Sequence, residues 1–95
     1  MTNEDKKIVA DYMWWAQYKY PSYYLNTKGD IESHHFDLND AGLVVQEMQK
    51  RGEFIPFVNS VCYSRLTDYI RINFIAWLFN ADNFFNTFVQ WRKTK

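Results

Sequence analysis

The sequence predicts an α+β domain in which a short antiparallel sheet of three to four strands is packed by three helices. Two observations lead to this prediction. Apolar residues recur at helical spacing near both ends of the chain and in its middle, whereas residues 53–79 alternate with a period of two. The strand-like runs are joined by connections of hairpin length, which favour antiparallel pairing. The 95 residues suit a single domain, 1–95.

The first helix is expected at residues 3–17. Thr2 can cap its start, and Asp5 three positions later completes a capping-box-like pair. Acidic residues in the first turn also suit the positive end of the helix dipole. The apolar stripe that defines this helix consists of Ile8, Val9, Tyr12, Met13 and Ala16.

Residues 18–36 allow two interpretations. Pro21 breaks any helix, and residues 26–30, with the sequence Asn-Thr-Lys-Gly-Asp, form a turn cluster. Residues 23–25 could pair with residues 31–35 as a short hairpin. Alternatively, the stretch is an ordered loop that its tyrosines hold on the core. The sequence alone leaves both interpretations open.

A second helix is expected at residues 38–51. Asp37 or Asn39 can cap it, and Gly52 can serve as the left-handed residue that terminates it. Its apolar stripe consists of Leu38, Ala41, Val44 or Val45, and Met48.

The period of two after this helix predicts three strands. Residues 54–58 form a short apolar strand whose Pro56 suits a sheet edge, and residues 61–66 return after an Asn-Ser turn. Residues 69–78 then present one wholly apolar face, made of Ile70, Ile72, Phe74, Ala76 and Leu78.

The last helix follows Asn80 or Asp82, either of which can cap it. Its apolar stripe is aromatic and consists of Phe84, Phe85, Phe88 and Val89, with Trp91 on the flank. Basic residues end this helix, where they suit the negative end of its dipole: Arg92, Lys93 and Lys95.

Three stretches carry a family resemblance. They are Ile8-Val9-Ala10-Asp11-Tyr12-Met13 followed by two tryptophans, Asp37-Leu38-Asn39-Asp40-Ala41, and Phe88-Val89-Gln90-Trp91. This arrangement resembles small proteins that carry the phage ABA sandwich domain, over nearly the whole chain. The resemblance implies a helix–sheet–helix sandwich and a phage or prophage origin. The family has no established activity, so no functional residue is carried over. Trp14 stands where the family usually has glycine, and we therefore expect the first helix to continue past it.

Composition restricts the functional classes. Apolar residues make up 47% of the chain and aromatic residues 20%, which excludes a disordered protein. Eleven basic and eleven acidic residues leave no net charge. Residues 1–53 hold six basic and nine acidic residues, whereas residues 54–95 hold five and two. Opposed half-charges of this size could favour a homodimer, but two ordinary solvated faces are the better explanation.

The sequence favours a cytoplasmic location. A single cysteine, Cys62, cannot form an internal disulfide, which favours a reducing compartment. No apolar run reaches the roughly 18 residues that a membrane span needs, so no membrane association is expected.

Sites for chemistry are sparse, and we expect neither an enzyme nor a metal or other cofactor. His34 and His35 lie near three carboxylates, but adjacent residues of an extended segment point to opposite faces, so one site could use only one of the two histidines. Cys62 with a histidine and Asp37 contains the residue types of a cysteine hydrolase, although such triples arise by chance and a buried, inert thiol is the ordinary case. A cysteine-dependent hydrolase is therefore the third-ranked function.

Single-stranded nucleic acid is the second-ranked ligand. It requires aromatic platforms interleaved with cations, which the tyrosines near Lys19 and Lys28 supply sparsely. Arg65, Arg71 and Arg92 would extend them if they shared a face. The zero net charge disfavours this function, because phosphate binding usually leaves a basic footprint.

The leading hypothesis is a non-enzymatic accessory protein that binds another macromolecule, most concretely a host protein such as a defence factor. Seven of the thirteen residues from Tyr12 to Tyr24 are aromatic. Exposed Tyr and Trp are typical of protein-binding surfaces, although the same rings could instead cap a small core. The candidate partner-binding residues are those that no helical stripe claims: Trp14, Tyr18, Tyr20, Tyr23 and Tyr24.

Overall fold

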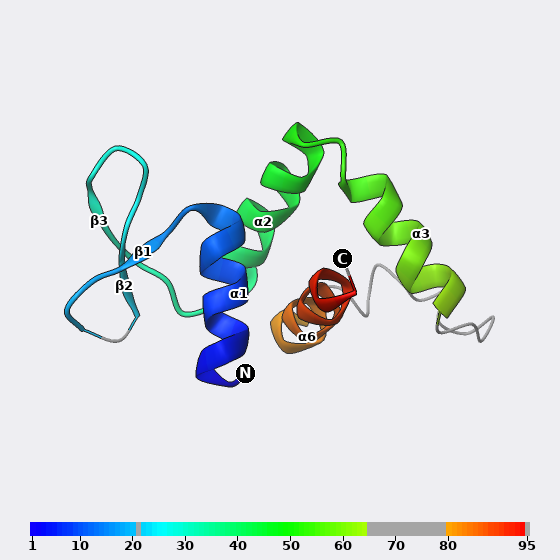
Figure 1. The fold of residues 1–95 in the computed structure, drawn as a ribbon, viewed down its shortest axis with the longest axis horizontal. Helices are drawn as coiled ribbons and strands as arrows, with labels where there is room; N and C mark the ends of the chain where they lie inside the picture. The colour runs from blue at the N-terminus through cyan, green and yellow to red at the C-terminus, as the bar shows by residue number, and fades with distance from the viewer. Residues whose placement is uncertain (21, 65–79, 95) are drawn as a thin grey trace.

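The computed structural model describes residues 1–20, 22–64 and 80–94. Over these ranges it contains four helices and three short strands (Figure 1): α1 (Asn3–Met13), β1 (Ala16–Gln17), β2 (Tyr23–Leu25), β3 (Ile31–Ser33), α2 (Leu38–Lys50), α3 (Phe54–Ser64) and α6 (Ala81–Lys93). The prediction of an α+β fold with a short antiparallel sheet is confirmed. The strand expected at residues 69–78 lies outside the described residues.

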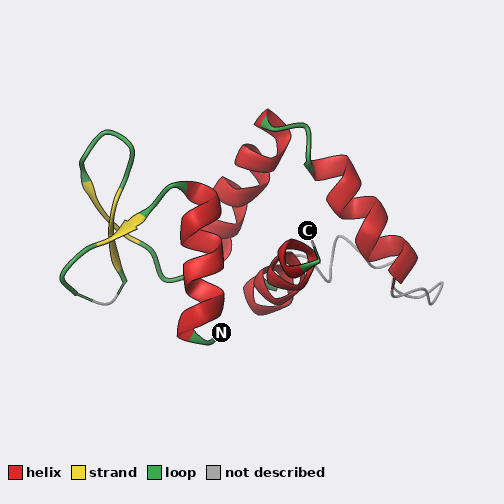
Figure 2. Cartoon of the chain, in the orientation of Figure 1, coloured by secondary structure: helices red, strands yellow, loops and turns green. Residues whose placement is uncertain are grey.

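The molecule is elongated, with extents of 44 × 23 × 21 Å. The three-stranded sheet and α3 stand at opposite ends of the long axis, and α1, α2 and α6 lie between them (Figure 2). The strands pair antiparallel in the order β1-β2-β3. Among the described residues, we find no helix with the length and apolarity that a membrane span requires.

Helix α1 begins as predicted but ends earlier. Thr2 and Asp5 form the expected capping box. The helix stops at Met13, because Trp14 takes a left-handed conformation with φ 62°. The Trp14 N–H donates to the carbonyl of Asp11, and the Trp15 N–H donates to that of Ala10 at 2.9 Å, which is the hydrogen-bond pattern of a Schellman motif. The expected continuation to residue 17 is therefore wrong, and residues 16–17 form β1 instead.

Helix α2 ends in the same motif, but with the residue that the motif prefers. Asp37 caps its start, and Gly52 follows its end with φ 69°. The N–H groups of Gly52 and Glu53 donate to the carbonyls of Gln49 and Met48. The predictions of this helix and of Gly52 as the terminating residue are confirmed, and of the two predicted caps, Asp37 and Asn39, the structure has Asp37.

Residues 23–33 form the hairpin that the sequence left open. Tyr24 lies opposite Glu32, and Leu25 lies opposite Ile31. The turn is held by Asn26, whose side-chain oxygen accepts from the N–H groups of Lys28 and Asp30 at 2.9 and 3.0 Å. The hairpin therefore follows from local turn chemistry.

The strands predicted at residues 54–58 and 61–66 are wrong over residues 54–64, which form α3. Phe54, Phe57 and Val58 lie at helical spacing as well as in a short apolar run, so periodicity alone does not separate the two structures. Pro56 lies in the first helical turn, where the missing N–H has no intrahelical partner to lose.

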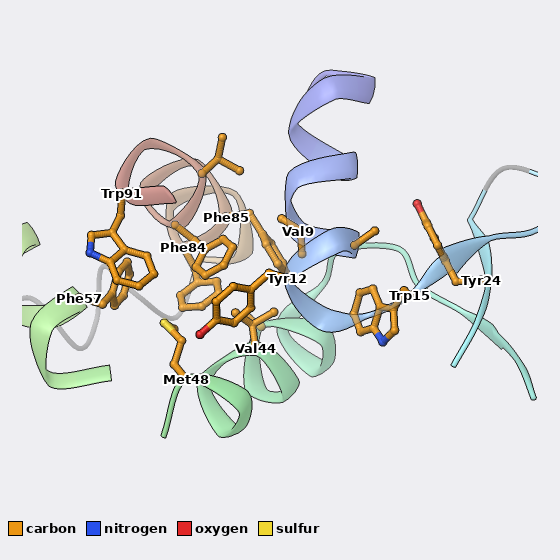
Figure 3. Packing of buried hydrophobic residues seen from close by; sticks show 14 residues of the cluster. Val9, Tyr12, Trp15, Tyr24, Val44, Met48, Phe57, Phe84, Phe85 and Trp91 are labelled. Carbon is orange, nitrogen blue, oxygen red and sulfur yellow. The ribbon is translucent and has the colours of Figure 1, made fainter. Parts of the chain in front are cut away.

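The core is centred on the aromatic stripe of α6. Phe84, Phe85 and Phe88 are each at most 1% exposed. Tyr12 of α1 meets Phe88 edge to face at 5.0 Å between ring centroids, and Phe57 of α3 meets the ring of Trp91 at 5.4 Å. Figure 3 shows the side chains of α1, α2 and α3 directed toward these rings. The last predicted helix and its apolar stripe are confirmed, with Asn80 as the cap.

Two glycine substitutions should change stability in opposite directions. Gly42 lies inside α2, and a Cβ there meets nothing within 4 Å, so Gly42→Ala should raise the free energy of unfolding by about 0.5–1 kcal/mol. Gly52 has the same open surroundings but a left-handed backbone, so Gly52→Ala should lower it by about 1 kcal/mol. Urea denaturation measures the free energy of unfolding of both variants. If both substitutions changed it in the same direction, the different backbone roles of Gly42 and Gly52 would be contradicted.

Candidate binding surface

Four of the five predicted contact residues are exposed. The exposed fraction is 68% for Trp14, 63% for Tyr20, 43% for Tyr23 and 36% for Tyr18, but only 5% for Tyr24. The aromatic run is therefore split between surface and core, residue by residue.

The exposed tyrosines gather on the sheet and its first loop. The rings of Tyr20 and Tyr23 meet edge to face at 6.4 Å, and the N–H of Tyr18 donates to the carbonyl of Tyr23. Ile31 on β3 is 53% exposed and, by strand alternation, shares a face with Tyr23. We call Tyr18, Tyr20, Tyr23 and Ile31 the hairpin surface. Within the part of the chain described, no ring contact joins Trp14 to it, so the structure does not bring all the predicted residues together.

The prediction of Tyr24 as a contact residue is corrected by its burial. Its ring packs against Trp15 and Phe36, with centroids 6.0 and 6.3 Å away. Burial raises the pKa of the Tyr24 hydroxyl, and the negative charge of Asp40 raises it further. Successive side chains of a strand point to opposite faces of the sheet. Tyr23 points outward on β2, and its neighbour Tyr24 therefore points inward.

A buried histidine ties the hairpin to α2. His34 is 4% exposed, and its ring stacks on Trp15 with 3.6 Å between centroids. Its Nδ1 lies 2.7 Å from Asp40 Oδ1, and its Nε2 lies 3.2 Å from Glu32 Oε1. The ring donates to both carboxylates only when both nitrogens carry protons. Asp40 also accepts from the N–H of Phe36 at 2.8 Å, which satisfies its second oxygen.

The two adjacent histidines point to different sides of the chain, His34 into the core and His35 to the surface. His35 points outward, as strand alternation predicts, and its Nε2 lies 2.9 Å from the hydroxyl of Ser33. In residues 1–20, 22–64 and 80–94, no three His, Cys, Asp or Glu side chains are placed to hold a metal ion. Asp37 caps α2 instead of orienting a histidine. Cys62 belongs to α3, at the opposite end of the molecule from the hairpin (Figure 1).

Trp14 lines a hollow of about 450 Å³ where the C-terminal ends of α1, α2 and α6 meet. The Arg51 guanidinium lies 4.0 Å from the centroid of the Tyr12 ring, and that of Arg92 lies 4.9 Å from the same centroid. Arg51 also donates to the main-chain carbonyl of Tyr12. We call this hollow the basic pocket; its lining residues are Ile8, Asp11, Tyr12, Trp14, Arg51, Arg92 and Lys93.

The carboxylates around the basic pocket are already engaged. Asp11 pairs with Lys7 at 2.9 Å, and Glu47 Oε2 lies 3.8 Å from Arg51 Nε. Asp5 lies 3.4 Å from Lys93. Arg92 has no ion pair with any carboxylate in the described part of the chain, and its guanidinium is held by aromatic rings.

Tyr12 forms the floor of the pocket and remains protonated. Its hydroxyl donates to Glu53 Oε1 at 2.9 Å. Burial raises the pKa of the Tyr12 hydroxyl well above the ordinary phenol value, and the hydrogen bond to Glu53 raises it further, although the two arginines oppose this shift. A neutral ring is therefore available to both guanidinium groups as a cation–π partner.

Sequence reasoning missed most of the basic pocket. It assigned Tyr12 to a buried stripe, and it placed Arg92 and Lys93 at a helix end without linking them to Arg51 of another helix. The available signal was that two helices, α2 and α6, carry basic residues in their last turns. Arg65 and Arg71, expected to extend a basic strip with Arg92, lie outside the described residues.

Comparisons with known proteins add no relative. No family model, curated protein or solved structure matches the chain. The resemblance to the phage ABA sandwich domain therefore stays a prediction.

Removing the buried carboxylate should weaken the fold strongly. Asp40→Ala leaves His34 and the Phe36 N–H without their hydrogen-bond partner, and each buried polar group left unsatisfied typically costs about 1–3 kcal/mol. Asp37→Ala, three residues earlier, removes only a helix cap and should cost about 1 kcal/mol. Chemical denaturation measures the free energy of unfolding of the two variants. A similar loss in both would show that the His34–Asp40 contact contributes no more to stability than a helix cap.

The raised pKa of Tyr12 predicts a loss of stability in alkali. Above about pH 10 the unfolded chain releases the tyrosine proton, whereas the folded chain retains it, so stability falls as the pH rises. For this one group the slope approaches about 1.4 kcal/mol per pH unit. Tyr12→Phe keeps the ring and should remove this part of the slope between pH 10 and 11. An unchanged slope in urea titrations of the variant would refute the assignment.

Proposed function

We propose that this protein is a non-enzymatic accessory protein that acts by binding another protein. Trp14 and the hairpin surface are the proposed contact regions. The observation that carries the proposal is the position of Trp14: a largely exposed indole stands where the backbone conformation favours glycine.

The Schellman motifs at the ends of α1 and α2 permit an internal comparison. Gly52 meets the left-handed requirement at the end of α2, whereas Trp14 meets it at the end of α1 with the largest side chain. A non-glycine residue in this conformation costs about 1 kcal/mol. Because 68% of Trp14 remains exposed, most of the indole surface makes no contact within the described fold. A residue that the fold does not require is better explained by contact with a partner.

The composition of the exposed surface agrees with this function. Trp, Tyr and Arg are the residues that most often dominate binding energy in protein interfaces. Trp14 lies beside Arg51 and Arg92, and the hairpin surface adds three tyrosines. A tyrosine or tryptophan contributes a large contact area at a small cost in conformational entropy.

The resemblance to phage proteins suggests which kind of partner this protein binds. A phage or prophage protein of this size, acting in the cytoplasm, could occlude a host protein without any catalysis. A host defence factor is the concrete partner we propose.

Trp14→Gly separates binding from folding. Glycine relieves the strain of the left-handed backbone, but it also increases the conformational entropy of the unfolded chain. Because these two effects oppose each other, the free energy of unfolding should change by less than about 1 kcal/mol. Partner capture from host lysate, quantified by mass spectrometry, should fall at least tenfold for Trp14→Gly and for the double variant Tyr20→Ala/Tyr23→Ala.

Leu43→Ala provides the matched control. Leu43 is 40% exposed on α2 and lies outside both proposed contact regions, so its loss should leave capture unchanged. A large drop in Tm for Trp14→Gly would assign the indole to the fold. Equal capture by all the variants would reject the proposed contact regions.

A further inference from the structure

We propose that the basic pocket receives a carboxylate side chain from an acidic segment of the partner protein. The inference rests on the proposed function and specifies the chemistry of its partner. It starts from the basic pocket, which the sequence did not predict.

The pocket presents two guanidinium groups in fixed positions. Both lie within 5 Å of the Tyr12 ring centroid, and Arg51 is held further by its bond to the Tyr12 carbonyl. Guanidinium groups match carboxylates through paired hydrogen bonds, and prior ordering reduces the entropy lost on binding.

The two arginines have different roles. Arg51 stabilises the junction of α1 and α2, because it bonds the α1 carbonyl and approaches Glu47. Within the described part of the chain, Arg92 contacts only aromatic rings, and it is half-buried. Arg92 is therefore the cation with donors available to a ligand.

Helix dipoles supply a competing explanation, since Arg92 and Lys93 also suit the negative end of α6. That effect favours a positive charge near the helix end but does not require a guanidinium on the Tyr12 ring or an exposed indole beside it. Trp14 lines the same hollow, so a carboxylate in the pocket would place its neighbouring apolar residues within reach of the indole.

An acidic protein segment fits the charge distribution better than a phosphate polymer. The chain carries no net charge, and residues 1–53 are acidic overall, so an extended polyanion would meet repulsion beyond the pocket. One or two carboxylates require only the local cations.

The test is a titration of the ¹⁵N-labelled full chain, followed by NMR. The probe is a short peptide with blocked ends that carries two glutamates among neutral residues, and the signals are the Trp14 indole N–H and the arginine Nε–H groups. The indole signal is assigned by its absence in Trp14→Gly. We expect saturable shifts at these groups and at least tenfold weaker binding by Arg92→Gln, with Arg92→Lys intermediate because it keeps the charge but loses the planar donors. Lys28→Gln, at the exposed hairpin turn, removes the same charge elsewhere and should change the affinity less than twofold.

Each other outcome overturns the inference. Absence of saturable shifts shows that the pocket binds no carboxylate, and equal weakening by Lys28→Gln shows unspecific charge attraction. Equal affinity for inorganic phosphate removes the carboxylate preference, and tighter binding of oligothymidylate assigns the pocket to nucleic acid. The titration needs no natural partner, so its result is independent of the capture experiment. The peptide can fail to bind while Trp14 and the tyrosines still capture a partner, and the peptide can bind while capture fails.

Discussion

Burial of the aromatic face of α6 is the constraint on which the rest of the described structure depends. Its phenylalanines meet a ring or side chain from every other described helix, and Phe85 reaches Phe36 at the base of the hairpin, 5.5 Å between centroids. Aromatic rings bring large apolar area, so four inward-facing rings on one helix can organise a small core. The sheet is joined to this core indirectly, through Trp15, Tyr24 and the buried His34. It therefore extends from the body of the molecule, where its outward tyrosines stay exposed.

The ends of α1 and α2 differ in how well the residue suits a left-handed backbone. At Gly52 the backbone requirement and the residue agree, whereas at Trp14 they conflict. Conflicts between local preference and observed structure concentrate at functional sites. The conflict at Trp14 coincides with exposure and with the two arginines, so one residue connects the strained turn to the basic pocket.

Local chemistry explains which elements were predictable from the sequence and which were not. Helix caps and turns were predictable because Thr2, Asp37, Asn80 and Asn26 bond to main-chain groups within four residues. Residues 54–64 were not, because a short apolar run satisfies strand and helix spacing alike. The end of α1 was misplaced because Trp14 is a rare choice for a left-handed position, so local preference predicted a longer helix.

The sequence by itself determined the α+β class, the hairpin turn, the ends of α2, the aromatic stripe of α6 and the concentration of aromatic residues between Tyr12 and Tyr24. These properties depend on contacts between residues close in the chain. Only the tertiary structure decided that Tyr24 is buried while Trp14, Tyr18, Tyr20 and Tyr23 are exposed. It also decided that Arg51 and Arg92 share one ring, because residues 41 positions apart meet only when α2 and α6 pack against α1. Packing across helices, which no local pattern encodes, created the candidate site.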